Sequence, residues 1–339
     1  MPYAFYSCTF TCANLENVAL QPTFPLDGPV RPASRMVGRS GDVKTLARII
    51  GEQHTSVLLA DERRFGKTTV ALAAIDTLRV DDRVALDCDL SAEGVRTPGA
   101  LAAHLASLAR AAGVGTVPNA STARRSARRI LERLGGSPSD AVGDLIGDRD
   151  VANAINLIAA LLGPAGPGVL SLDGVLRALQ AHAVLADEPV VLLVDEIQAL
   201  ADRRLWAVAD GQAVERALAD AVRRKGGGLV LCMAGSGPTL VKKFFDKGRP
   251  LSVIGARFAL QPIAYDDWCP ALIARFAELG QRIDADALDA VLAEAQGHPR
   301  RTMLVCHYAS QWARQNNDVV DDAVVPNAIS DAWAHPSWS

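Results

Sequence analysis

The chain alternates short apolar runs with segments of helical periodicity, and this alternation limits the folds it can adopt. The runs span residues 56–60, 84–88, 190–194 and 229–233. Each run is short and mostly apolar, as expected of a strand that is buried on both faces of a sheet. Strands that alternate with helices predict an α/β fold with a parallel sheet that helices cover on both sides.

Changes in this pattern predict where the parts of the chain begin and end. Residues 1–34 contain several prolines and show no clear period, so we expect an extended N-terminal arm. An α/β domain is expected over 35–263, with a helical insertion at about 98–188. Beyond it only helices are predicted, which form a small α-helical lid domain over 264–339, at about 267–279, 285–296, 300–315 and 321–333.

Composition excludes several classes of protein. Apolar residues make up 49% of the chain and charged residues 22%, which is typical of a globular protein. The net charge of −3 gives no overall basic field for binding nucleic acid. The apolar runs are too short to span a bilayer, and no secretory signal is apparent, so we expect a cytoplasmic protein without a membrane partner. Only Cys8 and Cys12 lie close together, so free thiols are expected rather than a zinc site.

Gly66, Lys67 and Thr68 follow the first apolar run and open a helix predicted over 69–78. This order matches the phosphate-binding loop G-x-x-x-x-G-K-[ST], in which backbone N–H groups and a helix N-terminus face phosphates. On this interpretation Lys67 neutralises the β- and γ-phosphate oxygens, and the Thr68 hydroxyl is a ligand of Mg²⁺. The alternative is a chance Gly-Lys-Thr at a turn between a strand and a helix.

One position of this loop departs from the pattern, because Asp61 stands where the first glycine is expected. A carboxylate at the mouth of an anion site repels phosphate. Arg63 and Arg64 are close enough in sequence to offset that charge. We therefore expect nucleotide to bind, and we expect Asp61 to affect the rate of hydrolysis more than binding.

The third apolar run ends in two adjacent carboxylates, Asp195 and Glu196. The carboxyl ends of parallel strands meet at one edge of a sheet, so Asp195 is predicted to face the same crevice as the phosphate loop. We expect Asp195 to hold Mg²⁺ and Glu196 to polarise the attacking water. An exposed acidic helix start is the alternative, since Asp and Glu are common there.

The fourth apolar run is followed shortly by Ser236, which stands between two glycines. If its strand lies beside the acidic strand, Ser236 is a candidate sensor of the γ-phosphate. A plain turn serine is equally compatible with the sequence.

Taken in order, these motifs resemble the archaeal and bacterial STAND-class P-loop ATPases, which are relatives of AAA+ and Orc1/Cdc6 proteins. The resemblance covers roughly residues 30–312. Six segments carry it: Met36-Val37-Gly38-Arg39, Arg63-Arg64-Phe65-Gly66-Lys67-Thr68, Leu193-Val194-Asp195-Glu196-Ile197-Gln198, Ala234-Gly235-Ser236, Leu260-Gln261-Pro262-Ile263 and Gly297-His298-Pro299-Arg300.

The resemblance implies an ASCE/AAA+-like P-loop NTPase with a helical lid, which binds ATP or ADP together with Mg²⁺. In such proteins the first segment lies beside the adenine, and the last reaches back from the lid to the nucleotide. The implied nucleotide-binding residues are Val37, Gly38, Arg39, Arg63, Arg64, Phe65, Gly66, Lys67, Thr68, Thr69 and Pro299.

Arginines outside the loop are further candidates. Arg300 begins a lid helix and is expected to reach the γ-phosphate if the lid covers the crevice. A solvated arginine at a helix start is the alternative. Arg124, Arg125, Arg128 and Arg129 form two pairs on one predicted helix face. They predict a contact with nucleic acid or with another subunit, or simply a solvated face.

Three functions are compatible with these features. The first is an ATP-hydrolysing molecular switch that depends on Mg²⁺ and acts on a partner protein, on its own oligomer or on nucleic acid. The second is a scaffold that binds nucleotide with little or no hydrolysis, which Asp61 favours and Lys67, Thr68 and Glu196 oppose. The third is a DNA-associated AAA+-like loader or regulator, which the near-neutral charge makes the weakest of the three.

Overall fold

A computed structural model describes residues 23–114 and 171–338 of the chain, apart from residues 27, 32, 225–227, 238–240, 242–243, 255 and 337. The described residues form two compact units. The larger unit is Gly38–Pro262, and the smaller one joins Ile263–Ser339 to the segment that ends at Val37. The arginine pairs at 124–129 and the two cysteines near the N-terminus lie outside the described residues.

The larger unit is built on a parallel sheet with the strand order β2-β3-β4-β1-β5. All four predicted strands are present, which confirms the parallel α/β prediction. β4 lies between β1 and β3, so the end of β4 separates the phosphate loop from the acidic strand end. The bounds are β1 Val57–Leu59, β2 Ala85–Asp89, β3 Val190–Asp195, β4 Leu229–Ala234 and β5 Ala256–Arg257.

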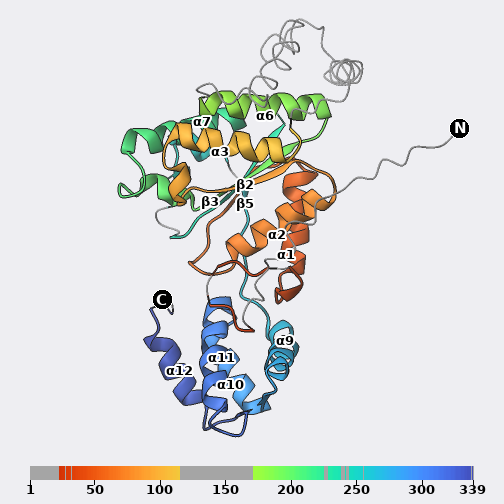
Figure 1. Ribbon diagram of the computed structural model, residues 1–339, viewed down its shortest axis with the longest axis vertical. Coiled ribbons are helices and arrows are strands. Elements are labelled where there is room, and N and C mark those ends of the chain that lie inside the picture. The colour runs from red at the N-terminus through yellow and green to blue at the C-terminus, as the bar shows by residue number, and fades with distance from the viewer. Residues whose placement is uncertain are drawn as a thin grey trace, which may run out of the picture. The chain divides into compact units, whose positions relative to one another are not determined.

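Helices cover both faces of this sheet, as the alternating pattern predicts. α1 and α2 pack together on one face, and α3, α6 and α7 pack together on the other (Figure 1). The strands between them are almost wholly apolar, because β3 and β4 are covered from both sides. The bounds are α1 Ser40–Gly51, α2 Lys67–Val80, α3 Pro98–Ala111, α6 Leu172–Ala186 and α7 Val208–Arg223, with short 3₁₀ turns at η2 Glu93–Val95, η3 Ile197–Ala201 and η4 Pro250–Val253.

The predicted helical insertion supplies α3 and α6, and both helices begin at a side-chain cap. The Thr97 hydroxyl accepts a hydrogen bond from Ala100 N at 3.1 Å, and Pro98 occupies the first helical position. The Ser171 hydroxyl caps α6 in the same way through Gly174 N. These capping residues fix the starts of the two helices that cover one face of the sheet.

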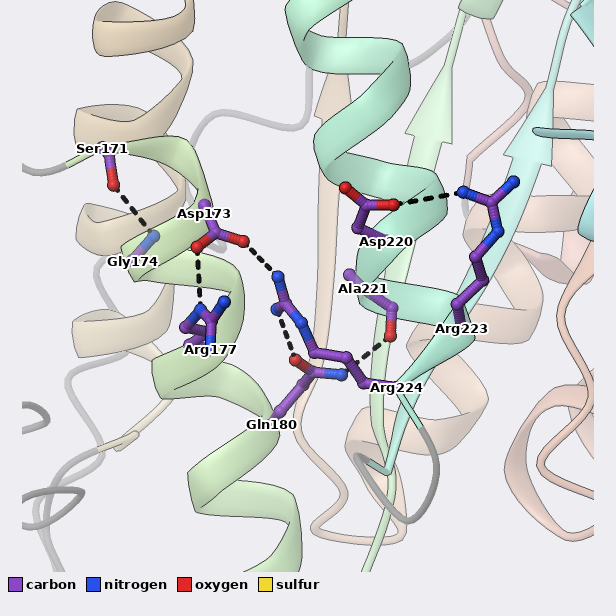
Figure 2. A network of polar contacts seen from close by, with 9 residues as sticks. All are labelled: Ser171, Asp173, Gly174, Arg177, Gln180, Asp220, Ala221, Arg223 and Arg224. Atoms are coloured by element: carbon purple, nitrogen blue, oxygen red, sulfur yellow. Dashed lines mark hydrogen bonds and ion pairs between the residues drawn. The ribbon is translucent and has the colours of Figure 1, made fainter. Parts of the chain in front are cut away.

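A polar network joins α6 to the end of α7 (Figure 2). Arg224 donates hydrogen bonds to Asp173 and to Gln180 Oε1, the latter at 2.9 Å. Gln180, which is 3% exposed, donates in turn to the carbonyl of Ala221 at 2.8 Å. Arg224 therefore links two helices rather than only complementing the dipole of its own helix.

The smaller unit contains the four predicted lid helices, α9 Tyr265–Glu278, α10 Ala285–Ala295, α11 Pro299–Ala313 and α12 Val325–Ala334. The expectation of helices alone is wrong, because β6 Arg282–Ile283 pairs in parallel with β7 Val319–Val320. Strands of two residues leave no alternating pattern in a sequence, so this pair could not be recognised there. No helix among the described residues is both long and apolar enough to cross a membrane.

The described part of the N-terminal segment belongs to the core of the smaller unit. Phe24 is 3% exposed, and its ring lies 4.9 Å from that of Phe276 in α9. Arg275 donates to the carbonyls of Thr23 and Arg35, both at 2.7 Å. Arg35 ends a short 3₁₀ turn, η1 Ala33–Arg35. The predicted arm is thus held against α9 at Phe24 and at the carbonyls of Thr23 and Arg35.

Candidate functional site

The phosphate loop lies between β1 and α2 and closes around the ammonium group of Lys67. Gly66 precedes α2 with φ = 92°, a left-handed conformation that favours glycine. Lys67 is 5% exposed, and its Nζ donates to the carbonyls of Asp61, at 3.0 Å, and of Glu62. Burial lowers the pKa of Lys67, while the carboxylates of Asp61 and Glu196 raise it. The loop thus holds one cation at the N-terminus of α2, where anions are favoured.

The other predicted loop residues differ in exposure. Arg63 is exposed, and Arg64 is half-buried with φ = 63°. Phe65 is buried, and its carbonyl accepts from Arg39 Nη2 at 3.2 Å. Thr69 follows Thr68 in the first turn of α2 and is half-buried. All of them belong to the loop or to the start of α2, and their contacts with nucleotide stay predictions.

Thr68 and Asp195 meet although 127 positions separate them in the sequence. The Thr68 hydroxyl donates to Asp195 Oδ2 at 2.8 Å, which joins the start of α2 to the end of β3. Asp195 Oδ1 accepts from the N–H of Glu196 at 2.8 Å. Burial raises the pKa of Asp195 to about 6, and the two hydrogen bonds oppose that rise. The predicted phosphate loop and acidic strand end therefore form one site.

The oxygens of Thr68 and Asp195 suit a magnesium ion. A hydroxyl and a carboxylate are the hard oxygen ligands that Mg²⁺ prefers, and they lie side by side at 2.8 Å. Among the described residues no group of three or more His, Cys, Asp or Glu side chains is placed to hold a metal. Mg²⁺ in nucleotide sites needs only one or two protein ligands, because substrate phosphates and waters supply the others.

Gln198 connects Glu196 to the end of β4, a role that was not predicted from the sequence. Its side-chain N–H donates to Glu196 Oε2, and its Oε1 accepts from Ser236 N at 3.0 Å. A side chain at Gly235 would press on Gln198, since an added Cβ would lie 2.8 Å from Gln198 Oε1. Ser236 therefore lies beside the acidic strand end, as its predicted place required. The available signal for Gln198 was its position two residues after Glu196.

The Asp61 carboxylate has a specific protein partner. Asp61 Oδ2 accepts from the backbone N–H of Leu260 at 3.0 Å. Nearby, Arg39 is 5% exposed and donates from Nη1 to the carbonyl of Gln261 at 2.7 Å. The Arg39 guanidinium also lies over the ring of Phe65, 5.5 Å from its centroid. Arg39 thus contacts protein groups, and its predicted contact with nucleotide, like that of Val37 and Gly38, stays a prediction.

The lid candidates lie at the start of α11 in the smaller unit. Arg300 is 8% exposed, so the alternative of a solvated arginine is wrong. Pro299 occupies the first turn of α11, and His298 Nδ1 caps that turn by accepting from Arg301 N at 3.4 Å. The approach of Pro299 and Arg300 to a nucleotide stays a prediction.

No protein-family model matches the chain, and no curated protein sequence matches it. Its structure is nevertheless similar to solved structures of P-loop ATPases. A Walker-type ATPase of Pyrococcus abyssi has a TM-score of 0.57 at 17% identity, over 92% of this chain and 75% of that one. The chain therefore has a P-loop ATPase fold.

Two further solved structures share this fold. The ORC2 protein of Aeropyrum pernix, in complexes with ADPNP and ADP, has a TM-score of 0.53 at 14% identity, over 92% of this chain and 71% of that one. Cdc6p of Pyrobaculum aerophilum has a TM-score of 0.51 at 14% identity, over 91% and 70% of the two chains. Similarity at this level of identity concerns the fold alone, because one fold serves many functions.

Proposed function

We propose that this chain binds ATP and hydrolyses it with the help of Mg²⁺, and that it acts as a nucleotide-dependent switch. One observation carries the proposal. The Thr68 hydroxyl and the Asp195 carboxylate lie 2.8 Å apart, at the N-terminus of the helix that begins with buried Lys67. A cation, a hydroxyl and a carboxylate gathered at a helix N-terminus suit a Mg²⁺–triphosphate better than any neutral ligand.

Each residue has a separate part in this proposal. Lys67 and the N–H groups that open α2 bind and orient the phosphates. Thr68 and Asp195 would hold Mg²⁺, which when bound supplies positive charge to the β- and γ-phosphate oxygens. Glu196 would orient the attacking water and accept its proton. Ser236, joined to Glu196 through Gln198, is the candidate contact of the γ-phosphate.

The same proposal includes the class of ATPase to which the chain belongs and the kind of molecule on which it acts. We assign the chain to the STAND class, in the cytoplasm, from its sequence motifs, with a partner protein or its own oligomer as the output. Binding of nucleic acid through Arg124, Arg125, Arg128 and Arg129 stays a prediction, since these residues lie outside the described part of the chain. Anisotropy titration of DNA at low and high salt tests it, because phosphate contacts weaken steeply with salt.

The decisive experiment compares nucleotide binding and turnover in three proteins. Wild type should bind ATP and release phosphate only with Mg²⁺. Glu196→Gln should bind ATP with unchanged affinity and lose turnover by at least about 100-fold, the usual contribution of a positioned base. Glu188→Gln is the matched control, because Glu188 is exposed and precedes β3 at the opposite end of the strand.

Two outcomes would change the assignment. If wild type and Glu196→Gln bind ATP equally and neither turns it over, the chain is a nucleotide-binding scaffold, the function that the Asp61 substitution favours. If wild type binds no nucleotide at any Mg²⁺ concentration, the proposal is wrong altogether.

A further inference from the structure

The carboxylate of Asp61 continues a strand ladder past the point where β1 ends. β1 and β5 pair in parallel through Val57 with Ala256 and Leu58 with Arg257. The N–H of Phe258 then donates to the carbonyl of Leu58 at 2.9 Å. In a parallel ladder alternate N–H groups face the same neighbour, so the next donor on this side is Leu260.

Asp61 supplies the acceptor that the backbone does not provide at this point. β1 ends at Leu59, and the chain turns into the phosphate loop. Leu260 N donates to Asp61 Oδ2 at 3.0 Å instead. Glycine, which is expected at position 61, has no side-chain acceptor. The departure from the loop pattern therefore creates a contact that the usual residue cannot make.

Arg39 makes a second, independent connection between the loop and the same segment. Its guanidinium donates to the carbonyl of Phe65, near the end of the loop, and to the carbonyl of Gln261. Both ends of the phosphate loop are thus tied to residues 260 and 261, one through Asp61 and one through Arg39.

The segment 260–263, which we call the junction, is where the chain leaves the larger unit. Its first two residues are bonded to the phosphate loop and to Arg39 in the larger unit. Its last residue, Ile263, donates from its N–H to the carbonyl of Gly297 at 3.0 Å in the smaller unit. Gly297 directly precedes His298, the cap of α11. Three of the four junction residues therefore make hydrogen bonds, Leu260 and Gln261 within the larger unit and Ile263 within the smaller one.

We propose that Asp61 is a positioning residue that couples the phosphate loop to the junction through its bond to Leu260 N. Phosphate that binds in the loop stiffens it, and the Asp61 carboxylate transmits that stiffening to the junction. The coupling requires an acceptor oxygen at position 61 and does not require its charge. This inference rests on the proposed binding of ATP.

Two substitutions separate the acceptor from the charge. Asp61→Asn keeps an oxygen that can accept from Leu260 N and removes the negative charge. Asp61→Gly restores the usual loop residue and removes the acceptor. Both should bind ATP at least as tightly as wild type, because each removes a carboxylate that repels phosphate.

Hydrogen exchange at the backbone N–H groups of Leu260 and Ile263 measures the coupling, with and without a non-hydrolysable ATP analogue and Mg²⁺. In wild type and in Asp61→Asn the analogue should slow exchange at these positions by about tenfold, the usual effect of one hydrogen bond. In Asp61→Gly this slowing should disappear at Leu260, whose N–H loses its acceptor, while the N–H groups of β3, which do not depend on Asp61, keep the protection seen in wild type. If Asp61→Gly does not fold, Asp61→Leu takes its place, since it keeps the bulk without an acceptor.

The outcomes separate this inference from the proposed function. Absence of analogue binding to all three proteins would overturn the ATP proposal, and the coupling with it. Binding to all three with equal slowing at the junction in Asp61→Gly would overturn the coupling alone. Loss of the slowing in Asp61→Asn as well would show that charge, and not the acceptor, is what matters, which also contradicts the assignment.

Discussion

Gln198 joins the ends of two neighbouring strands through one side chain. Its amide donates to the Glu196 carboxylate that follows β3 and accepts from the N–H of Ser236 that follows β4. An amide suits this position because it offers a donor and an acceptor at once. Gln198 thus holds the Glu196 carboxylate in position relative to the end of β4.

Replacing Gln198 should slow turnover with little effect on binding. We expect Gln198→Ala to lower kcat by about tenfold, the usual effect of losing one positioning hydrogen bond, and to leave KM within about twofold. Gln198→Glu should be worse, since it brings a second negative charge next to Glu196. Steady-state phosphate release measures both constants. An equal rise in KM with unchanged kcat would show that Gln198 serves binding instead.

We expect His182 in α6 to make the stability of the protein sensitive to acid. Burial lowers the pKa of its imidazole below the ordinary 6.5, and its Nδ1 is buried without a hydrogen-bond partner. The unfolded chain therefore takes up a proton at a higher pH than the folded protein does. The contribution of His182 to the free energy of unfolding is therefore fully present above pH 6.5, where the ring is neutral in both states. It is lost as the pH falls from 6.5 toward the lowered pKa of His182 in the folded protein.

Replacing His182 with leucine should therefore remove part of this acid sensitivity. Between pH 7.5 and pH 5 the free energy of unfolding of wild type should fall more than that of His182→Leu. Urea unfolding at the two pH values measures the difference. His54→Asn is the control, because His54 is exposed and its left-handed backbone, with φ = 48°, tolerates asparagine. A His182→Leu protein with the same pH dependence as wild type would contradict the prediction.

At the scale of elements, the start of α2 determines the shape of the site. The helix begins directly at Lys67, and the Gly66 position before it supplies no side-chain cap to its first turn. Gly66 makes the turn from the loop into the helix in the left-handed region. The hydrogen-bond network between α6 and α7 lies elsewhere and joins two of the helices that cover one face of the sheet (Figure 2).

Gly66→Ala should damage both stability and binding. A side chain at φ = 92° costs about 1–2 kcal/mol, although nothing lies within 4 Å of the added Cβ. We expect urea unfolding to show that loss and ATP affinity to fall, since the loop relaxes away from its phosphate-binding shape. Gly99→Ala in the first turn of α3 is the matched control. It also meets nothing within 4 Å but has helical backbone, so it should gain up to about 1 kcal/mol.

At the scale of the whole molecule, the larger unit is one continuous stretch of the chain, and in the sequence it stands between the two parts that form the smaller unit. The segment before Val37 and the residues from Ile263 onward share one core, in which Phe24 packs against Phe276. The smaller unit is thus built from two distant parts of the sequence. Arg275 fastens the first part to the second with hydrogen bonds to two backbone carbonyls.

Arg275→Met should therefore release the N-terminal segment. The carbonyls of Thr23 and Arg35 lose their charged donor, which we expect to cost about 2–4 kcal/mol, within the range for a buried polar network. Limited proteolysis should cut the variant between residues 23 and 35 much faster than wild type. Arg282→Met is the control, since the Arg282 side chain is 72% exposed. Equal protection of the segment in Arg275→Met would refute this role.

The sequence by itself determined four of the five described strands of the parallel sheet, all but β5, and the two halves of the site. The buried strands are short, continuous apolar runs. Such a run is a local property of the sequence, and a window of a few residues is enough to recognise it. Lys67, Thr68 and Asp195 could be found because a phosphate loop and an acidic strand end have fixed places relative to their strands. Parallel topology then brings Thr68 and Asp195 to one edge of the sheet.

The tertiary structure alone decided which groups meet across long stretches of sequence. The partner of Asp61 lies 199 positions away, and Gln198 meets Ser236 across 38 positions. The two-residue strands of the smaller unit and the packing of Phe24 against Phe276 leave no local pattern either. A hydrogen bond of one side chain depends on where the folded backbone places its partner, and no periodicity in the sequence records that position. For this reason the sequence shows Asp61 only as a departure from the phosphate-loop pattern, whereas in the structure its carboxylate accepts a specific hydrogen bond from Leu260 N.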